Sequence, residues 1–156
     1  MNTLVSVIIP VYNRSELLQK AIASVRAQSY QNWELLVVDD GSTDDCDTTI
    51  QAFADPRISL ITLGHSGHIG LVRNAGARAA KGAWLTFLDS DDTWMPGKLQ
   101  LQLDTLQETG LQWCYGAFEH MDATGTSLPF KAGCYRPVSG WIIKDLLTTE
   151  ASVHIG

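Results

Sequence analysis

The stretch that decides the fold is Leu4–Val25, which reads LVSVIIPVYNRSELLQKAIASV. Its first part, Leu4–Ile9, is a short run rich in β-branched residues that Pro10 closes, and such a run predicts a buried strand. Further along, the apolar positions change to helical spacing, at Leu17, Leu18, Ala21, Ile22 and Val25. Ser15 stands where an N-cap would accept the first free amide hydrogen bonds of that helix. The stretch therefore predicts a strand followed directly by a helix.

The same alternation repeats along the chain. Further strands are expected at Trp33–Val38, Ile58–Leu63 and Ala83–Leu88, and further helices at Thr43–Ala54, at Leu71–Lys81 and between Pro96 and Gly110. Strands that alternate with helices pair in parallel through right-handed crossovers. The predicted fold class is therefore α/β: a Rossmann-like, layered α/β/α structure with a mainly parallel central sheet.

The pattern becomes less regular toward the end of the chain. We expect a strand at Trp113–Glu119, a turn at Asp122–Gly125 and a short helix after Ser139. The chain is expected to divide into a βα half, residues 1–110, and the start of a second half, residues 111–156, that continues in a longer protein.

Composition excludes several classes of protein. Eleven Lys and Arg against seventeen Asp and Glu give a net charge of −6, which disfavours a nucleic acid partner. Three cysteines without a C-x-x-C pair indicate reduced thiols rather than a disulfide framework or a zinc site. No apolar stretch approaches the roughly 20 residues of a transmembrane span, and no signal peptide is seen. We expect a protein of the cytoplasm, or one peripheral at the cytoplasmic face of the membrane.

Polar residues follow each of the first four predicted strands. They are Pro10–Arg14, Asp39–Ser42, Gly64–Gly67 and Asp89–Asp92. In an open parallel sheet, ligands bind outside the carboxyl ends of the strands, so these segments form the candidate site. Five carboxylates would share this edge, where like charges raise one another's pKa and a divalent cation relieves the repulsion.

The individual motifs at this edge differ in what they indicate. Asp89 and Asp91 form a D-x-D directly after a buried strand, which points to a site for a hard cation, whereas Asp44 and Asp45 fit helix caps. The first turn lacks G-x-G-x-x-G and the chain lacks G-x-x-x-x-G-K-[ST], which argues against dehydrogenases and P-loop ATPases. The glycines at 64, 67 and 70 suit a close approach to a ligand or an ordinary loop, and Arg73 suits a phosphate or a solvated helix face.

Four segments carry a resemblance to a known family. They are Val7–Asn13 (VIIPVYN), Val38–Asp44 (VDDGSTD), Gly70–Gly76 (GLVRNAG) and Phe87–Asp92 (FLDSDD). In order and strand context they resemble the motifs of the family 2 glycosyltransferases, which have the GT-A fold, and the likeness covers Val5 to about Leu103. The resemblance implies an inverting transferase that uses a nucleotide-diphosphate sugar, usually a UDP-sugar, with Mg or Mn and a saccharide or lipid-linked acceptor.

The resemblance also implies roles for single residues. Tyr12 would stack on the nucleobase and Asp40 would accept a hydrogen bond from the ring N–H of the base. Arg73 would contact the nucleotide at its phosphates, Asp89 would lie near the ribose or the metal, and Asp91 would ligate the metal. The implied nucleotide site comprises Pro10, Tyr12, Asn13, Asp40, Arg73, Asp89 and Ser90, and the implied metal ligands are Asp89 and Asp91.

No general base is assigned from the sequence. In this family the base is an acidic residue well beyond the D-x-D, and the later carboxylates, Glu119, Asp122, Asp145 and Glu150, lie in no matching motif. His154 fits a structural role. Two alternatives stay open: a nucleotide-sugar-binding module without its catalytic half, and a haloacid dehalogenase-like phosphotransferase, whose D-x-D-x-T motif Asp89–Thr93 also satisfies.

Overall fold

A computed structural model describes residues 3–122 and 125–128 of the chain. The chain divides into two units, and the boundary between them along the sequence lies between Asp104 and Thr105. The resemblance implies that residues 1–110 bind the nucleotide sugar and that residues 111–156 begin an acceptor-side half; this division stays a prediction. In the described part of the chain, no helix combines the length and apolar character that crossing a membrane requires.

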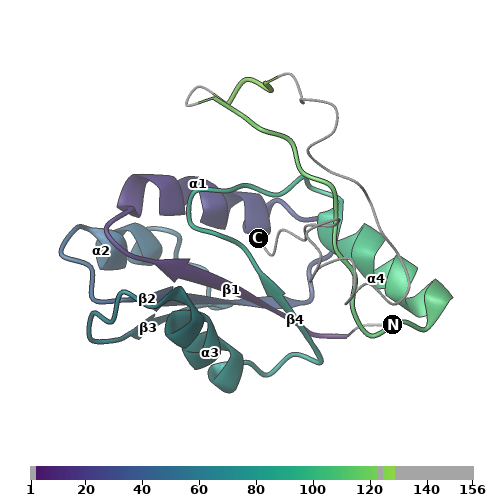
Figure 1. Ribbon diagram of the computed structural model, residues 1–156, viewed down its shortest axis with the longest axis horizontal. Coiled ribbons are helices and arrows are strands. Elements are labelled where there is room, and N and C mark those ends of the chain that lie inside the picture. Colours follow the sequence, from purple (N-terminus) through teal and green to yellow (C-terminus); the bar gives the residue numbers. More distant parts are fainter. Residues whose placement is uncertain (1–2, 123–124, 129–156) are drawn as a thin grey trace, which may run out of the picture. The chain divides into compact units, whose positions relative to one another are not determined.

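The first unit is built on a four-stranded, all-parallel sheet in the order β3-β2-β1-β4 (Figure 1), which confirms the predicted α/β class. Helices α1 and α2 lie on one face of the sheet and α3 on the other. The elements in chain order are β1 (Val5–Val11), α1 (Ser15–Arg26), β2 (Trp33–Asp39), α2 (Cys46–Gln51), β3 (Ile58–Thr62), α3 (Ile69–Ala79), β4 (Trp84–Phe87) and α4 (Lys98–Thr109).

Two apolar clusters hold the layers together. The alternate residues of β1 from Val5 to Val11 pack with the apolar stripe of α1 and with Cys46 and Ile50 of α2. On the opposite face, Ile8 packs with Val38 of β2 and Val72 of α3. Because both faces of β1 are covered, every residue of this strand is buried, as expected for a parallel sheet between two helical layers.

The structure corrects the end of the first strand, which runs through Pro10 to Val11 instead of closing before Pro10. The carbonyl of Ile8 accepts a hydrogen bond from Leu88 on the β4 side, and that of Val11 accepts one from Asp40 on the β2 side. The nitrogen of Pro10 therefore faces the β4 side, where pairing has already ended at Ile8 and Phe87. A missing N–H costs nothing at such a position.

Helix α2 is shorter than predicted, and its flanking residues explain why. The N–H and hydroxyl of Thr43 are directed at Asn13 Oδ1, and Ala54 has a positive φ of 47° that a helix cannot contain. The expected N-cap at Ser15 is also wrong: helix α1 begins at Ser15 itself, whose N–H donates to Asp44 Oδ2 at 2.9 Å. One free N–H group at the start of α1 thus finds its acceptor in the loop that follows β2.

The strand expected at Trp113–Glu119 is not formed, since this segment contains no regular element. An isolated antiparallel bridge between Met121 and Ser127 brackets the predicted turn instead, and Asp122 Oδ1 accepts the N–H of Thr126 at 3.0 Å. An alternating pattern predicts a half-buried surface, but a strand also needs a neighbour to pair with. The helix expected after Ser139, together with Asp145, Glu150 and His154, lies outside the described residues.

Candidate functional site

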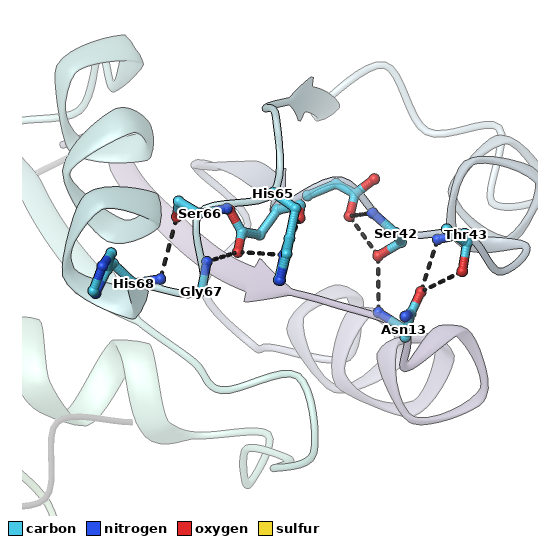
Figure 2. A network of polar contacts seen from close by, with 9 residues as sticks. Asn13, Ser42, Thr43, His65, Ser66, Gly67 and His68 are labelled. Carbon is cyan, nitrogen blue, oxygen red and sulfur yellow. Dashed lines mark hydrogen bonds and ion pairs between the residues drawn. The ribbon is translucent and has the colours of Figure 1, made fainter.

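The loops that follow β1, β2, β3 and β4 meet at one edge of the sheet, as predicted. Figure 2 shows the polar network at this edge, with His65, Ser66 and Gly67 of the β3 loop on one side and Asn13, Ser42 and Thr43 on the other. This network contains some residues that the sequence singled out and several that it did not.

Asp40 is held by the loop that follows β3. Its carboxylate is buried, and Oδ1 accepts hydrogen bonds from the N–H and the hydroxyl of Ser66, both at 2.9 Å. Oδ2 accepts the N–H of Gly67 at 2.9 Å. Burial opposes ionisation of Asp40, but the hydrogen bonds from Ser66 and Gly67 outweigh it and hold the pKa of the carboxyl below its ordinary value. Asp40 is therefore a fixed negative charge at the edge.

His65 adds a second kind of contact to the same carboxylate. Its Nδ1 lies 3.1 Å from Asp40 Oδ2 and 3.0 Å from the carbonyl oxygen of Asp40. Because both neighbours are hydrogen-bond acceptors, we assign the proton to Nδ1. The imidazole also stacks on the ring of Tyr12, with the centroids 4.1 Å apart and the planes 18° apart. Tyr12 and His65 both remain about half exposed.

Asp39, the other acid after β2, ties its own loop to the end of β1. Oδ1 of Asp39 accepts the N–H of Ser42 at 3.0 Å and the hydroxyl of Ser42 at 2.5 Å. The hydroxyl oxygen of Ser42 in turn accepts the N–H of Asn13 at 2.8 Å, while Asn13 Oδ1 accepts the N–H of Thr43 at 2.7 Å. Asn13 has a φ of 50°, a left-handed conformation that asparagine tolerates better than most residues. In this structure the Asn13 side chain joins two loops.

The two acids of the D-x-D are each paired with an arginine. Arg73 of α3 donates from Nη2 to Asp89 Oδ1 at 2.6 Å, and Arg14 donates from Nη1 to Asp91 Oδ2 at 2.6 Å. Asp91 and Arg14 are both about half exposed, and Asp89 is partly exposed. Ser90, which lies between the two acids, is buried.

The segment after the D-x-D is anchored to the end of α1. The side-chain amide of Gln28 donates to the carbonyl of Met95 at 2.8 Å, and its oxygen accepts the N–H of Leu99 at 3.0 Å. The N–H of Trp94 donates to the hydroxyl of Ser24 at 3.1 Å. The D-x-D therefore lies between the end of β4 and a segment that is hydrogen-bonded to α1 and to Gln28 just beyond it.

These contacts correct the expected charge balance. The sequence predicts mutually repelling carboxylates whose pKa values rise, whereas each of Asp39, Asp40, Asp89 and Asp91 has hydrogen-bond donors of its own and the pKa of Asp40 is lowered. The relief comes from backbone N–H groups and arginines. Charge repulsion is therefore no argument for a cation here.

The carboxylates of the D-x-D fit a divalent cation only when a substrate supplies further ligands. Within the described ranges no three Asp, Glu, His or Cys side chains gather into a group that could hold a metal alone. Mg²⁺, however, is commonly held by one or two carboxylates together with phosphate oxygens of a substrate. Asp89 and Asp91 each use one oxygen on an arginine and have a second, so the pair fits a metal shared with a diphosphate.

The edge also contains residues that the sequence did not single out. Arg14, Ser42 and His65 lie in the predicted segments, but no motif assigned them a partner. Gln28 was also not singled out; it lies past the C-terminal end of α1, away from this edge, and holds the segment that follows the D-x-D. A buried glutamine at the end of an amphipathic helix was the available signal, because buried polar groups need hydrogen-bond partners.

A parallel α/β sheet with a D-x-D after its fourth strand and an acid-rich edge defines a domain of the GT-A type. The sequence profile described as "Glycosyl transferase family 2" matches residues 6–134, and the chain belongs to this family. This membership argues against the phosphotransferase alternative.

Two curated relatives show what the chain is similar to. It is 39% identical over 116 residues to the E. coli UDP-Glc:alpha-D-GlcNAc-diphosphoundecaprenol beta-1,3-glucosyltransferase WfgD, across 74% of this chain and 46% of the relative. It is 35% identical over 127 residues to the putative teichuronic acid biosynthesis glycosyltransferase TuaG of Bacillus subtilis, across 80% of this chain and 50% of the relative. The chain thus spans about half the length of these relatives.

Solved structures show the same fold. S. aureus TarS in complex with UDP-GlcNAc is 29% identical, with a TM-score of 0.64 over 67% of this chain and 31% of that chain. The mannosyltransferase PcManGT from Pyrobaculum calidifontis, in complex with GDP-Man and Mn2+, is 26% identical, with a TM-score of 0.61 over 65% of this chain and 32% of that chain.

Proposed function

We propose that this chain binds the donor of an inverting, metal-dependent transferase that moves a sugar from a UDP-sugar to an acceptor hydroxyl. The observation that carries the proposal is the joint presence at one edge of the half-exposed Tyr12 ring, the ionised Asp40 and the arginine-paired acids of the D-x-D. A nucleotide needs these three kinds of partner: a ring to stack on, an acceptor for its base N–H, and cationic groups near its phosphates.

Each end of the donor has its own partners in this proposal. The base stacks on Tyr12 and donates its ring N–H to Asp40, while Arg73 faces the phosphates from α3. Pro10, Asn13 and Ser90 shape the walls, since Pro10 and Ser90 are buried and Asn13 joins the β1 and β2 loops. PcManGT is described with GDP-Man, so the uridine preference rests on the likeness to WfgD and TarS.

Asp89 and Asp91 would hold Mg²⁺ or Mn²⁺ through the oxygens that their arginines leave available. When bound, the metal stabilises negative charge on the departing nucleotide diphosphate. Arg14 and Arg73 already neutralise these acids, so the protein can keep the D-x-D in place before the donor arrives. No described side chain is proposed as the general base.

The acceptor is proposed from the relatives. WfgD is named for a diphosphoundecaprenol acceptor and TuaG for teichuronic acid biosynthesis, so we propose a lipid-linked or saccharide acceptor met in the cytoplasm or at the cytoplasmic face of the membrane.

Calorimetric titration of UDP with Mn²⁺ or with EDTA tests the donor site. We expect binding with Mn²⁺, a loss of at least tenfold in EDTA, and a similar loss in Asp91→Ala, because the diphosphate would then face Asp89 without a bridging cation. GDP should bind more weakly than UDP. Equal UDP affinity in Mn²⁺ and EDTA would contradict the metal bridge, and equal affinity for UDP and GDP would contradict the uridine preference.

A further inference from the structure

His65 makes the two contacts that the proposed function gives to the nucleobase. Its ring stacks on Tyr12 at a centroid distance of 4.1 Å, and its Nδ1 faces the Asp40 carboxylate at 3.1 Å. A uracil ring bound as proposed would lie on Tyr12 and donate an N–H to Asp40. We propose that His65 holds the place of the nucleobase in the ligand-free protein and that the nucleotide must displace it. This inference rests on the proposed function and adds a competing group to that site.

The carboxylate of Asp40 has no room for both rings. An ionised carboxylate offers about four acceptor positions, and three of those of Asp40 receive the Ser66 N–H, the Ser66 hydroxyl and the Gly67 N–H. His65 Nδ1, which faces the carbonyl oxygen of Asp40 at 3.0 Å, also lies 3.1 Å from Oδ2 and covers the remaining position. The two backbone N–H groups are fixed by the loop. The base therefore has to take the position of a side chain, and His65 is the one that also covers Tyr12.

His65 is placed so that it can leave without disturbing the loop. Its side chain is 49% exposed, while the backbone that carries it stays anchored through Ser66 and Gly67 on Asp40. The ring can therefore rotate toward solvent while the loop keeps its shape. Figure 2 shows the His65 ring between Ser66 and Gly67 on one side of the network and Ser42 and Asn13 on the other.

Displacement has a measurable cost in affinity. When an internal group occupies a binding position for a fraction of the time, the apparent affinity falls in proportion to the fraction that remains open. A position that is filled for about two thirds to nine tenths of the time lowers affinity about 3- to 10-fold. Removing the His65 ring should raise the affinity for UDP by that factor.

Calorimetry of UDP in saturating Mn²⁺, on the wild-type chain, His65→Ala and His68→Ala, tests the inference. His68 is the matched control: it lies three positions away on the same loop, and its N–H donates to Ser66 Oγ at 3.2 Å. We expect His65→Ala to bind UDP about 3- to 10-fold more tightly, with His68→Ala unchanged. His65→Phe, which keeps a ring but cannot donate to Asp40, should fall between His65→Ala and wild type. Pyrophosphate, which has no base, should bind all these proteins equally.

Weaker or unchanged UDP binding by His65→Ala, with wild type binding normally, would overturn the inference and leave the proposed function standing. If UDP binds neither the wild type nor the variants, the proposed function fails and the inference with it.

Proton NMR of the histidine ring gives a second readout that does not depend on affinity. In the free protein the His65 ring signals, identified by their absence in His65→Ala, should be shifted by the stacked Tyr12 ring. Saturation with UDP should move them to the values of an exposed histidine. Signals that keep their stacked position in the UDP complex would overturn the displacement, since the base would then stack on the other face of Tyr12.

Discussion

Two strands, β2 and β4, end in acidic residues at the same edge of the sheet, and these two pairs of acids are held in different ways. At the end of β2, Asp39 and Asp40 are 7% and 4% exposed, and their donors are backbone N–H groups, hydroxyls and one imidazole. After β4, Asp89 and Asp91 have side chains 39% and 45% exposed, and the donor at each is an arginine.

The difference separates the residues that build the edge from those that can exchange partners. Buried hydrogen bonds from backbone N–H groups cannot be given up without moving a loop, and each bond to a charged group contributes about 1.5–3 kcal/mol. Exposed ion pairs contribute about 0–1 kcal/mol and break readily. We infer that the β2 end sets the shape of the edge, and that the exposed ion pairs of the β4 end can rearrange when a ligand arrives.

The largest loss of stability is expected for Asp40→Asn. The amide keeps one acceptor oxygen and places an NH₂ group opposite the donors of Ser66 or Gly67, so the free energy of unfolding should fall by about 2–4 kcal/mol. Urea unfolding followed by circular dichroism measures this. A loss below about 0.5 kcal/mol would show that the β2 end is as exchangeable as the β4 end.

Gly41→Ala tests the backbone of the same end. Gly41 has a φ of +75°, and an added Cβ would lie 2.8 Å from the backbone nitrogen of His65. Such a contact with backbone, in a conformation that alanine rarely adopts, should cost about 2–3 kcal/mol. Gly64→Ala is the matched control, because Gly64 has a negative φ and open space at its Cβ position, and it should stay within about 0.5 kcal/mol of wild type. Equal effects of the two changes would contradict the crowding at Gly41.

Asp55 sharpens the comparison, since its side chain is only 7% exposed, close to that of Asp40, but it is paired with arginine as Asp89 is. Hydrogen bonds from Arg57 lower the pKa of Asp55 from 3.8 to about 2. A carboxyl with a lowered folded-state pKa stabilises the protein fully above the unfolded value and loses this contribution as the pH falls through the folded value. As the pH falls from about 4 to about 2, protonation of Asp55 should therefore lower the free energy of unfolding by about 1–2 kcal/mol. Thermal unfolding of wild type and Asp55→Asn across this range measures it; identical slopes would contradict the assignment.

The smallest effect on stability is expected at the D-x-D. Asp91→Asn removes an exposed ion pair with Arg14 and should change the free energy of unfolding by less than about 1 kcal/mol. The same variant should lose UDP binding in Mn²⁺ at least tenfold. A variant that unfolds as readily as Asp40→Asn would show that Asp91 is a structural residue.

Local patterns predicted the sheet and its helices well. The β-branched run before Pro10 and the helical spacing of Leu18, Ile22 and Val25 give β1 and α1 nearly to the residue. A strand buried on both faces leaves a continuous apolar run, and a helix buried on one face leaves an apolar residue every three or four positions. Element ends were less predictable. The start of α1 depends on Asp44, which is distant in sequence, so no local rule for capping could find it.

The candidate site was predicted in its location but not in its contacts. The parallel topology brings Tyr12, Asp40 and Asp89 to one edge whatever their partners are. That Asp40 faces Ser66 and that Asp91 faces Arg14 depends on the paths of loops, which hydrophobic periodicity does not encode. The predicted roles of these residues toward a nucleotide and a metal stay predictions.

The hydrogen bonds of Gln28 have a consequence for the order in which the molecule assembles. The first N–H groups of a helix have no partner within it, and the one at Leu99 in α4 is satisfied by Gln28, 71 positions earlier in the chain. On the ribosome, residues emerge at about 5–20 per second, so β1, α1 and Gln28 are made several seconds before Leu99. The D-x-D should therefore reach its final position only after Leu99 has been made, and the Leu99 amide should exchange with deuterium far faster in Gln28→Ala than in the wild-type chain.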